Sequence, residues 1–358
     1  QHLFRAGTVT IKFMFDKLIG NEPVKTVLRR LLANKRVPNA LLFAGAGGVG
    51  KRQFALELAK AFVCQNPKNS EACDVCSACR RADRFAFPKS DDRDAFRKVI
   101  FSEHSDIGLV IPYNKNILVD AIRELETEAN FRPFEAKSRI FIINDADKMN
   151  DSAANALLKT LEEPPATTYI FLITSRPDAL LPTILSRCQM LRFAPLEAKQ
   201  IEGFLEGTRQ FAIADAQLLS KFANGSIGRA LQLDVGKFRE QRATMIQVLK
   251  SLLLKQDRAA LLRIAEELND AKNKDFYETH LNILQTLIHD VWILRLGQSE
   301  EVIVNADLKN DLKQMAENTT VKRPASWLAE IEILRGNLNV NLNRKIATDA
   351  LFMQMAGG

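Results

Sequence analysis

The first half of the chain alternates short apolar runs with segments whose apolar residues recur at helical spacing. Over residues 16–193 this alternation predicts a parallel β-sheet whose strands are joined by crossover helices. The expected strands are 41–44, 107–111, 140–143, 169–174 and 189–193. Between the third and fourth of them, residues 151–161 carry apolar side chains at i, i+3, i+4 and i+7, which predicts a helix. The first half is therefore expected to be an α/β domain.

The second half has no β-rich run of comparable strength. After Pro195–Glu197 the chain has Leu- and Ala-rich amphipathic patterns throughout, which predict helices, and Gly225–Gly228 separates a small helical unit from a larger one. The expected division is an α/β core at 14–197, a small helical domain at 198–237 and an all-helical domain at 238–358. Residues 1–13 are expected to be an upstream extension or an artefact, because Met14 would make a natural start.

The composition is that of an ordinary globular protein, with 46% hydrophobic and 26% charged residues in a chain of 358. No apolar run reaches the ~18 residues of a membrane span, so no membrane partner is expected. The net charge of +7 permits contact with nucleic acid. A well-solvated basic surface explains it equally, since there is no dense run of Lys and Arg. Cysteine usage and a nucleotide-type loop favour a cytoplasmic location.

That loop, Gly45–Lys51, follows the first predicted strand and precedes a helix predicted over 53–62. Strand, loop and helix are the context that the phosphate-binding pattern G-x-x-x-x-G-K-[ST] requires, with glycines Gly45 and Gly50 and the lysine Lys51 in place. The hydroxyl that should bind Mg²⁺ is replaced by Arg52, which has no metal-ligating group. The loop therefore predicts an NTPase-like protein that does not hydrolyse its nucleotide.

Two more strand ends complete the candidate nucleotide site. Asp145 follows an apolar strand at the position where P-loop NTPases hold Mg²⁺. The next position, where a Glu orients the attacking water, is Ala146, whose methyl group has no such function. Thr174 closes the following strand and joins the same expected site. Arg52 and Ala146 thus depart from the catalytic pattern at two separate positions.

Four cysteines are spaced as a metal site: Cys64, Cys73, Cys76 and Cys79. Two C-x-x-C steps bring thiolates around one tetrahedral ion, and four sulfurs match structural Zn²⁺ with no open catalytic position. A redox pair, buried thiols or an iron–sulfur cluster are the alternatives. Cys188 lies far away in sequence and is expected to be inert.

Several strings together resemble one family: 15–22, the loop at 45–51, the cysteine module, 155–165 (NALLKTLEEPP), 185–188 (LSRC) and the Asn-rich 337–341. The chain resembles the bacterial DNA polymerase III clamp-loader subunits, which are AAA+ ATPases, and among them the delta-prime group. The choice of delta-prime over gamma or tau depends on Arg52, Ala146 and the lid sequence Gly225–Arg229. In that lid sequence the arginine is shifted by one place, which turns a helical side chain by about 100°.

The resemblance implies an AAA+ core, a helical lid and a helical collar that assembles with gamma/tau and delta subunits into a five-membered ring. That ring loads the sliding clamp onto primed DNA. The resemblance also implies that Arg187 is an arginine finger acting in trans on the ATP of a neighbouring subunit. Phe15, Leu18 and Ile19 match the segment that covers adenine in active members. ATP and Mg²⁺ are then expected in the neighbouring subunits and are doubtful in this one.

Two other functions remain open from the sequence. The chain could be an active gamma/tau-like ATPase with unusual metal ligation, by Asp145 and water. It could also be an independent DNA-binding module in which Lys159 on the helix 151–161 faces phosphates, although an exposed lysine is more often only solvated. The segment 80–103 is longer and more charged than the family pattern, and the sequence indicates no function for it.

Overall fold

The computed structural model describes residues 14–208, 211–270, 276–299, 302–337 and 343–357. The predicted extension 1–13 and most of the Asn-rich stretch lie outside these residues. The chain folds into two compact units, one of residues 1–210 with 223–231 and one of 211–222 with 232–358. Across the described parts of both units, no helix combines the length and apolar character that a membrane span needs.

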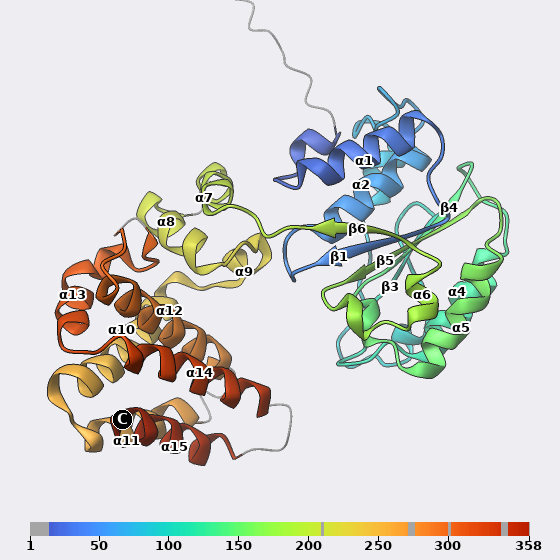
Figure 1. The fold of residues 1–358 in the computed structure, drawn as a ribbon. Coiled ribbons are helices and arrows are strands. Elements are labelled where there is room, and N and C mark those ends of the chain that lie inside the picture. The colour runs from blue at the N-terminus through green and yellow to red at the C-terminus, as the bar shows by residue number, and fades with distance from the viewer. Residues whose placement is uncertain (1–13, 209–210, 271–275, 300–301, 338–342, 358) are drawn as a thin grey trace, which may run out of the picture. The chain divides into compact units, whose positions relative to one another are not determined.

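A six-stranded sheet in the order β2-β3-β4-β5-β1-β6 forms the centre of the first unit (Figure 1). Its strands are β1 (Ala40–Gly45), β2 (Ile100–Phe101), β3 (Ile107–Val110), β4 (Arg139–Ile143), β5 (Thr168–Thr174) and β6 (Gln189–Phe193). All neighbours pair in parallel except β2, which is antiparallel to β3. The five predicted strands and the α/β fold class are confirmed, while β2 was not predicted.

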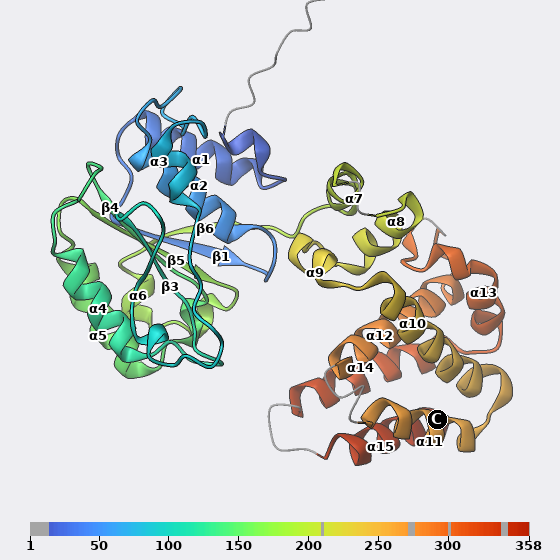
Figure 2. The same cartoon turned by 180° about the vertical axis from the view of Figure 1, so that it is seen from behind.

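Helices cover both faces of this sheet, as the two views in Figures 1 and 2 show. Alternate residues of β1 point to opposite faces. Leu41 and Phe43 join the core beneath α1 (Glu22–Ala33) and α2 (Lys51–Val63). Leu42 joins the core beneath α4 (Val119–Ala129) and α5 (Asp151–Glu162). The inner strands β1, β3, β4 and β5 are buried on both faces, which explains why their sequences are largely continuous apolar runs. The edge strand β6 instead alternates buried and exposed residues.

Side-chain hydrogen bonds at the N-terminus determine where two helices of the first unit begin. Asn150 accepts a hydrogen bond from the Ala153 N–H and starts α5, the helix predicted at 151–161. Glu197 and Gln200 form a capping box that starts α7 (Ala198–Gly207) directly after the predicted boundary at Pro195–Glu197. The remaining helices of the first unit are α3 (Ser77–Ala82), α6 (Pro182–Leu185) and α9 (Ile227–Gln232).

The second unit is helical throughout its described residues, as predicted. It contains α8 (Ile213–Phe222), α10 (Val235–Lys250), a π-helical turn (Ser251–Lys255), α11 (Arg258–Asn269), α12 (Tyr277–Arg295), α13 (Lys309–Glu317), α14 (Lys322–Asn337) and α15 (Arg344–Gly357). The buried carboxylate of Asp290 in α12 accepts the Val304 and Asn305 N–H groups and so fixes the chain ahead of α13. The helices α7 and α9 group with the first unit and α8 with the second. The division into three domains stays a prediction.

Candidate nucleotide and metal sites

The phosphate loop lies between β1 and α2, in the strand–loop–helix context that the sequence predicts. Gly48 and Gly50 have φ of 74° and 96°, left-handed values that favour glycine. Gly50 is the N-cap of α2, so Lys51 is the first residue of that helix. The loop therefore has the backbone form of a phosphate cradle.

Lys51 is directed at its own loop. Its Nζ donates hydrogen bonds to the carbonyl oxygens of Gly45 and Ala46, both at 2.6 Å, and the residue is only 6% exposed. Burial lowers the pKa of Lys51, against the attraction of Asp145 and Asp147, which raises it. The ammonium group that should bind phosphates is thus bonded to two backbone carbonyls of the loop.

Arg52 packs on an aromatic ring. Its guanidinium lies 5.1 Å from the ring centroid of Phe87, which belongs to the segment 80–103 that had no function assigned from sequence. Burial lowers the pKa of Arg52, while Asp145 raises it. A cation over the face of an aromatic ring is an attractive contact. At the position of the usual metal-binding hydroxyl, this chain therefore has the Arg52 guanidinium, which packs against Phe87 of the segment 80–103.

At the end of β4 the structure brings Asp145, Ala146 and Asp147 to the same edge of the sheet as Thr174. Asp145 pairs with Lys148 at 3.1 Å, and Ala146 is fully buried. Asp147 accepts hydrogen bonds from the Thr174 hydroxyl at 2.7 Å and from the Arg176 Nε at 3.1 Å.

Burial alone raises the pKa of Asp147, but the hydrogen bonds from Thr174 and Arg176 outweigh it, and the pKa is lowered. The Thr174 hydroxyl, expected at the nucleotide, is engaged by this carboxylate in the described chain. Sequence reasoning missed Asp147 and Arg176. The signal for Asp147 was a second acid two residues after the predicted metal ligand.

The stretch Gly225–Arg229, singled out in the sequence, lies against the phosphate loop. The Gly228 N–H donates to the Gly48 carbonyl oxygen at 2.9 Å. A Cβ atom on Gly48 would lie 2.2 Å from the Ser226 Oγ, and one on Gly228 would lie 2.9 Å from the Gly48 Cα. Both glycines are therefore required by the close approach of two backbones. Whether the Arg229 side chain misses a phosphate stays a prediction.

Arg187 follows α6 and precedes β6. Its Nη2 bonds the Glu162 Oε1 at 2.6 Å, and its Nη1 donates to the Thr183 carbonyl at 2.9 Å. The Arg187 side chain remains 33% exposed. Glu162, the last residue of α5, is a partner that sequence reasoning did not predict. Lys159 on the same helix is 84% exposed and pairs with Glu126 at 3.0 Å.

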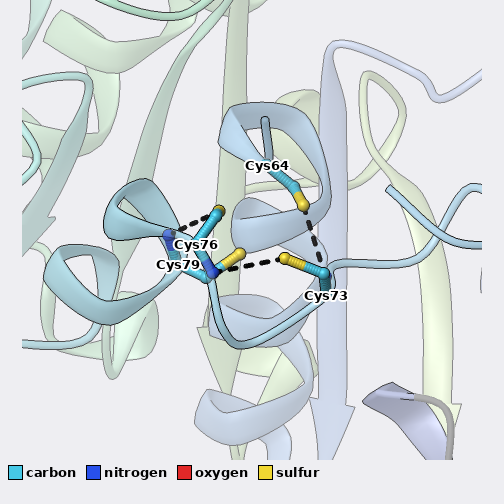
Figure 3. A group of neighbouring side chains, drawn as sticks. All are labelled: Cys64, Cys73, Cys76 and Cys79. Atoms are coloured by element: carbon cyan, nitrogen blue, oxygen red, sulfur yellow. Dashed lines mark hydrogen bonds between the residues drawn. The ribbon is translucent and has the colours of Figure 1, made fainter. Parts of the chain in front are cut away.

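The four cysteines of the predicted metal site converge, as Figure 3 shows. Their sulfur atoms all lie within 4.8 Å of one another, while sulfurs around a tetrahedral Zn²⁺ at 2.3 Å are separated by about 3.8 Å. The N–H groups of Cys73, Cys76 and Cys79 point at the sulfurs of Cys64, Cys73 and Cys76, respectively.

Thiolates are favoured in this cluster at Cys76. Burial raises the pKa of Cys76, but the Cys79 and Gln65 N–H groups and the neighbouring thiols outweigh it and lower the pKa to about 6. This donor set fits a single structural Zn²⁺ with no open position. Cys188 differs, because burial raises the pKa of its thiol to about 12.

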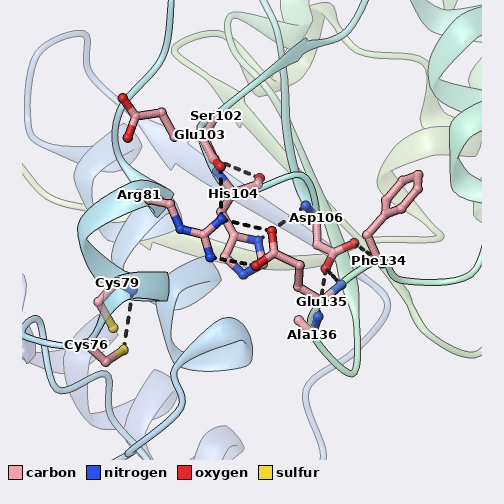
Figure 4. A network of polar contacts seen from close by, with 10 residues as sticks. All are labelled: Cys76, Cys79, Arg81, Ser102, Glu103, His104, Asp106, Phe134, Glu135 and Ala136. Carbon is pink, nitrogen blue, oxygen red and sulfur yellow. Dashed lines mark hydrogen bonds and ion pairs between the residues drawn. The ribbon is translucent and has the colours of Figure 1, made fainter.

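Beside the cysteines a polar network joins α3 to the segment before β4 (Figure 4). Arg81 binds both carboxylate oxygens of Glu135, at 2.9 and 2.6 Å. The fully buried Asp106 accepts the N–H groups of Phe134, Glu135 and Ala136 at 2.7 to 2.8 Å. The metal module is thereby connected to the N-terminal edge of the sheet.

Comparison with known proteins identifies the family. A family model described as DNA polymerase III, delta subunit, matches residues 20–197, and another, described as its C-terminal part, matches 237–355. The DNA polymerase III subunit delta' of Bacillus subtilis is 30% identical over 94% of this chain and 96% of its own length. The chain belongs to the delta-prime family. The delta' subunit of Escherichia coli is 28% identical over 88% of each chain. The tau subunit of B. subtilis is 29% identical over 76% of this chain and 46% of its own length.

In this delta-prime family member the expected groups therefore lie together, and the structure shows the partners that each has within the chain. Lys51 and Thr174 lie at the phosphate-loop edge of the sheet and bind protein groups there. Arg52 packs on Phe87, and Arg187 pairs with Glu162. The cysteines form the arrangement expected from sequence.

Proposed function

We propose that this chain is the non-hydrolysing delta-prime subunit of a DNA polymerase III clamp loader and supplies Arg187 in trans to the ATP of a neighbouring subunit. The observation that carries the proposal is the match to B. subtilis delta' along nearly the whole of both chains. The partners are gamma/tau and delta subunits in a five-membered AAA+ ring in the cytoplasm. The ring acts on the sliding clamp and primed DNA, and its ATP and Mg²⁺ are held by the neighbouring subunits.

The absence of hydrolysis is supported by the chemistry of the loop. Arg52 offers no ligand to Mg²⁺, and Ala146 offers no carboxylate to an attacking water. Two catalytic positions are therefore replaced. This argues against the tau-like ATPase, the other function that the sequence left open.

The finger role is supported by the exposure of the Arg187 side chain and by the exchangeable ion pair that it makes. Its guanidinium is part-exposed and is held by Glu162, which is itself 49% exposed. Exposed ion pairs contribute only about 0–1 kcal/mol, so a phosphate of higher charge can displace Glu162 as the partner. An arginine that reaches a γ-phosphate in trans stabilises the charge of the transition state and is worth about 10³–10⁵ in rate.

ATP hydrolysis by the isolated chain tests the absence of activity. The purified protein is expected to show no turnover above that of Lys51→Ala, while a tau subunit of the same organism provides the positive control. Turnover that disappears in Lys51→Ala would contradict the proposal. Assembly is tested separately, by mixing the chain with gamma/tau and delta. A stable complex that depends on residues 238–358 is expected, and no complex would overturn the assignment to the ring.

A further inference from the structure

Two acidic residues flank Cys73 in the metal-binding loop, and both bind groups outside that loop. Glu71 is only 3% exposed. Its Oε2 accepts the backbone N–H of Phe15 at 3.0 Å, and its Oε1 accepts the Arg29 Nε at 2.7 Å. This carboxylate therefore holds the N-terminal segment Met14–Lys17 and α1 at the same time.

Asp74 makes a second connection from the other side of Cys73. Its Oδ2 accepts a hydrogen bond from the Lys17 Nζ at 2.6 Å, and its Oδ1 lies 2.6 Å from the Lys60 Nζ. Lys60 belongs to α2, and its buried ammonium group also bonds Glu57 at 2.9 Å. Asp74 thus joins the N-terminal segment to the helix that begins at the phosphate loop.

The N-terminal segment is fixed by these contacts over three successive residues. Phe15 is fully buried and stacks on Phe54 of α2, with ring centroids 6.4 Å apart. Asp16 binds the Nη2 of Arg29 at 2.6 Å, the same guanidinium that Glu71 holds. With Lys17 on Asp74, each of the three residues reaches the metal-binding loop directly or through one arginine.

Little regular structure holds this loop. Between α2 and α3 the chain has no named strand or helix, and an isolated bridge between Lys68 and Glu71 closes a tight turn with positive φ at residues 69 and 70. Asp74, beside Cys73, also has a positive φ, at 59°. Left-handed non-glycine residues persist only where their surroundings impose them. A metal that joins Cys64 to Cys73, Cys76 and Cys79 is such a restraint, because it closes the loop at both ends and in the middle.

We propose that the metal-binding loop is a clasp: the metal fixes Cys73, and the flanking carboxylates of Glu71 and Asp74 thereby hold residues 15–17 against α1 and α2. The role of the metal centre is then to position the N-terminal segment beside α2, the helix that follows the phosphate loop. The clasp does not depend on the proposed function, since all of its contacts lie within one unit.

The rate of hydrogen exchange at the Phe15 amide measures directly whether the N-terminal segment is held, because that N–H is donated to Glu71. Exchange is compared in the metal-loaded chain, in the chain stripped by a chelator under reducing conditions, and in Cys76→Ser. Removal of the metal is expected to speed exchange at Phe15 about tenfold or more. The Ala153 amide, capped by Asn150 on the opposite face of the sheet, should change less than about twofold. Unchanged protection at Phe15 in the metal-free chain overturns the proposal. Equal acceleration at both amides means that the metal-free chain has unfolded as a whole, and the Glu71→Gln variant then decides.

The Glu71→Gln variant tests the proposal in a folded chain that still holds its metal, which matters if the metal-free chain unfolds. This variant is expected to retain one bound Zn²⁺ per chain and still to speed Phe15 exchange, because the charged acceptor is lost. Glu103→Gln is the matched control, since Glu103 is an exposed carboxylate of the same unit that pairs with Arg84. It should leave Phe15 exchange unchanged. A Glu71→Gln chain with wild-type Phe15 exchange would show that Glu71 does not transmit the restraint.

Discussion

Replacing Lys51 by alanine removes two hydrogen bonds inside the phosphate loop. In a phosphate loop of this pattern the lysine also reaches the phosphates of a bound nucleotide. Here the Nζ donates to the Gly45 and Ala46 carbonyls at 2.6 Å each. The substitution should therefore destabilise the protein in the absence of any nucleotide.

The magnitude follows from the contacts of Lys51. A hydrogen bond to a charged group contributes about 1.5–3 kcal/mol, so two of them give roughly 3–6 kcal/mol in gross terms. Burial of the ammonium opposes this, as the lowered pKa of Lys51 indicates. Ala46 is exposed, so water replaces part of the lost bonding at its carbonyl. We expect a net loss of about 2 kcal/mol in the free energy of unfolding of the first unit.

Hydrogen exchange at the amides of β1 measures this loss, since 2 kcal/mol corresponds to roughly 30-fold faster exchange. Trp292 and Trp327 both lie in the second unit. Tryptophan fluorescence during urea unfolding should therefore be unchanged and serves as an internal control. Lys148→Ala is the matched variant, because Lys148 makes only a part-exposed pair with Asp145, and its loss should cost less than about 1 kcal/mol. If Lys51→Ala and Lys148→Ala are equally stable, Lys51 does not support the loop.

Two further predictions concern buried groups elsewhere in the chain. Burial lowers the pKa of His280, so the unfolded chain binds a proton that the folded chain does not. The stability of the second unit should therefore be fully present above about pH 7.5 and decline as the pH falls through about 6.5, when it is followed by tryptophan fluorescence in urea. The decline should be smaller in His280→Gln than in the wild type, and equal declines in the two chains would exclude His280 as the cause. In the first unit, Asp106→Ala leaves three N–H groups at 134–136 without their acceptor and should cost about 3 kcal/mol or more. The control Asp120→Ala removes a half-exposed carboxylate of the same unit and should cost less than about 1 kcal/mol by hydrogen exchange at β4. A similar small cost for Asp106→Ala would contradict the reasoning.

The strands and the metal site could be predicted because their signals are local. A strand buried on both faces needs a continuous apolar run, and β1, β3, β4 and β5 each have one. The edge strand β6 has an alternating pattern of buried and exposed residues, which is also a local signal. β2 has only two residues and follows a charged segment, so its pairing with β3 has no periodic signal. The cysteine spacing encodes a metal site because the ligand atoms must converge within a few ångströms.

The partners of the site residues could not be predicted, since they lie far away in sequence. Thr174 and Asp147 are separated by 27 positions, and Arg187 and Glu162 by 25. Glu71 and Phe15 are separated by 56. Which acid receives which donor is decided by how strands and helices pack. Residue types therefore predicted which strand ends lie beside the phosphate loop, but not that Lys51 and Thr174 bind protein groups there.

The rate of ATP hydrolysis by a reconstituted clamp loader tests the central claim most directly. Arg187→Ala is compared with wild type and with Arg84→Ala, an exposed arginine of the same unit that pairs with Glu103 outside the candidate nucleotide site. Assembly is checked for each variant by size-exclusion chromatography. The account predicts that Arg187→Ala assembles normally and lowers DNA-stimulated hydrolysis by about 10³-fold at the single site it serves, whereas Arg84→Ala retains wild-type activity. Undiminished hydrolysis by a fully assembled Arg187→Ala complex, measured at that site, would contradict the account.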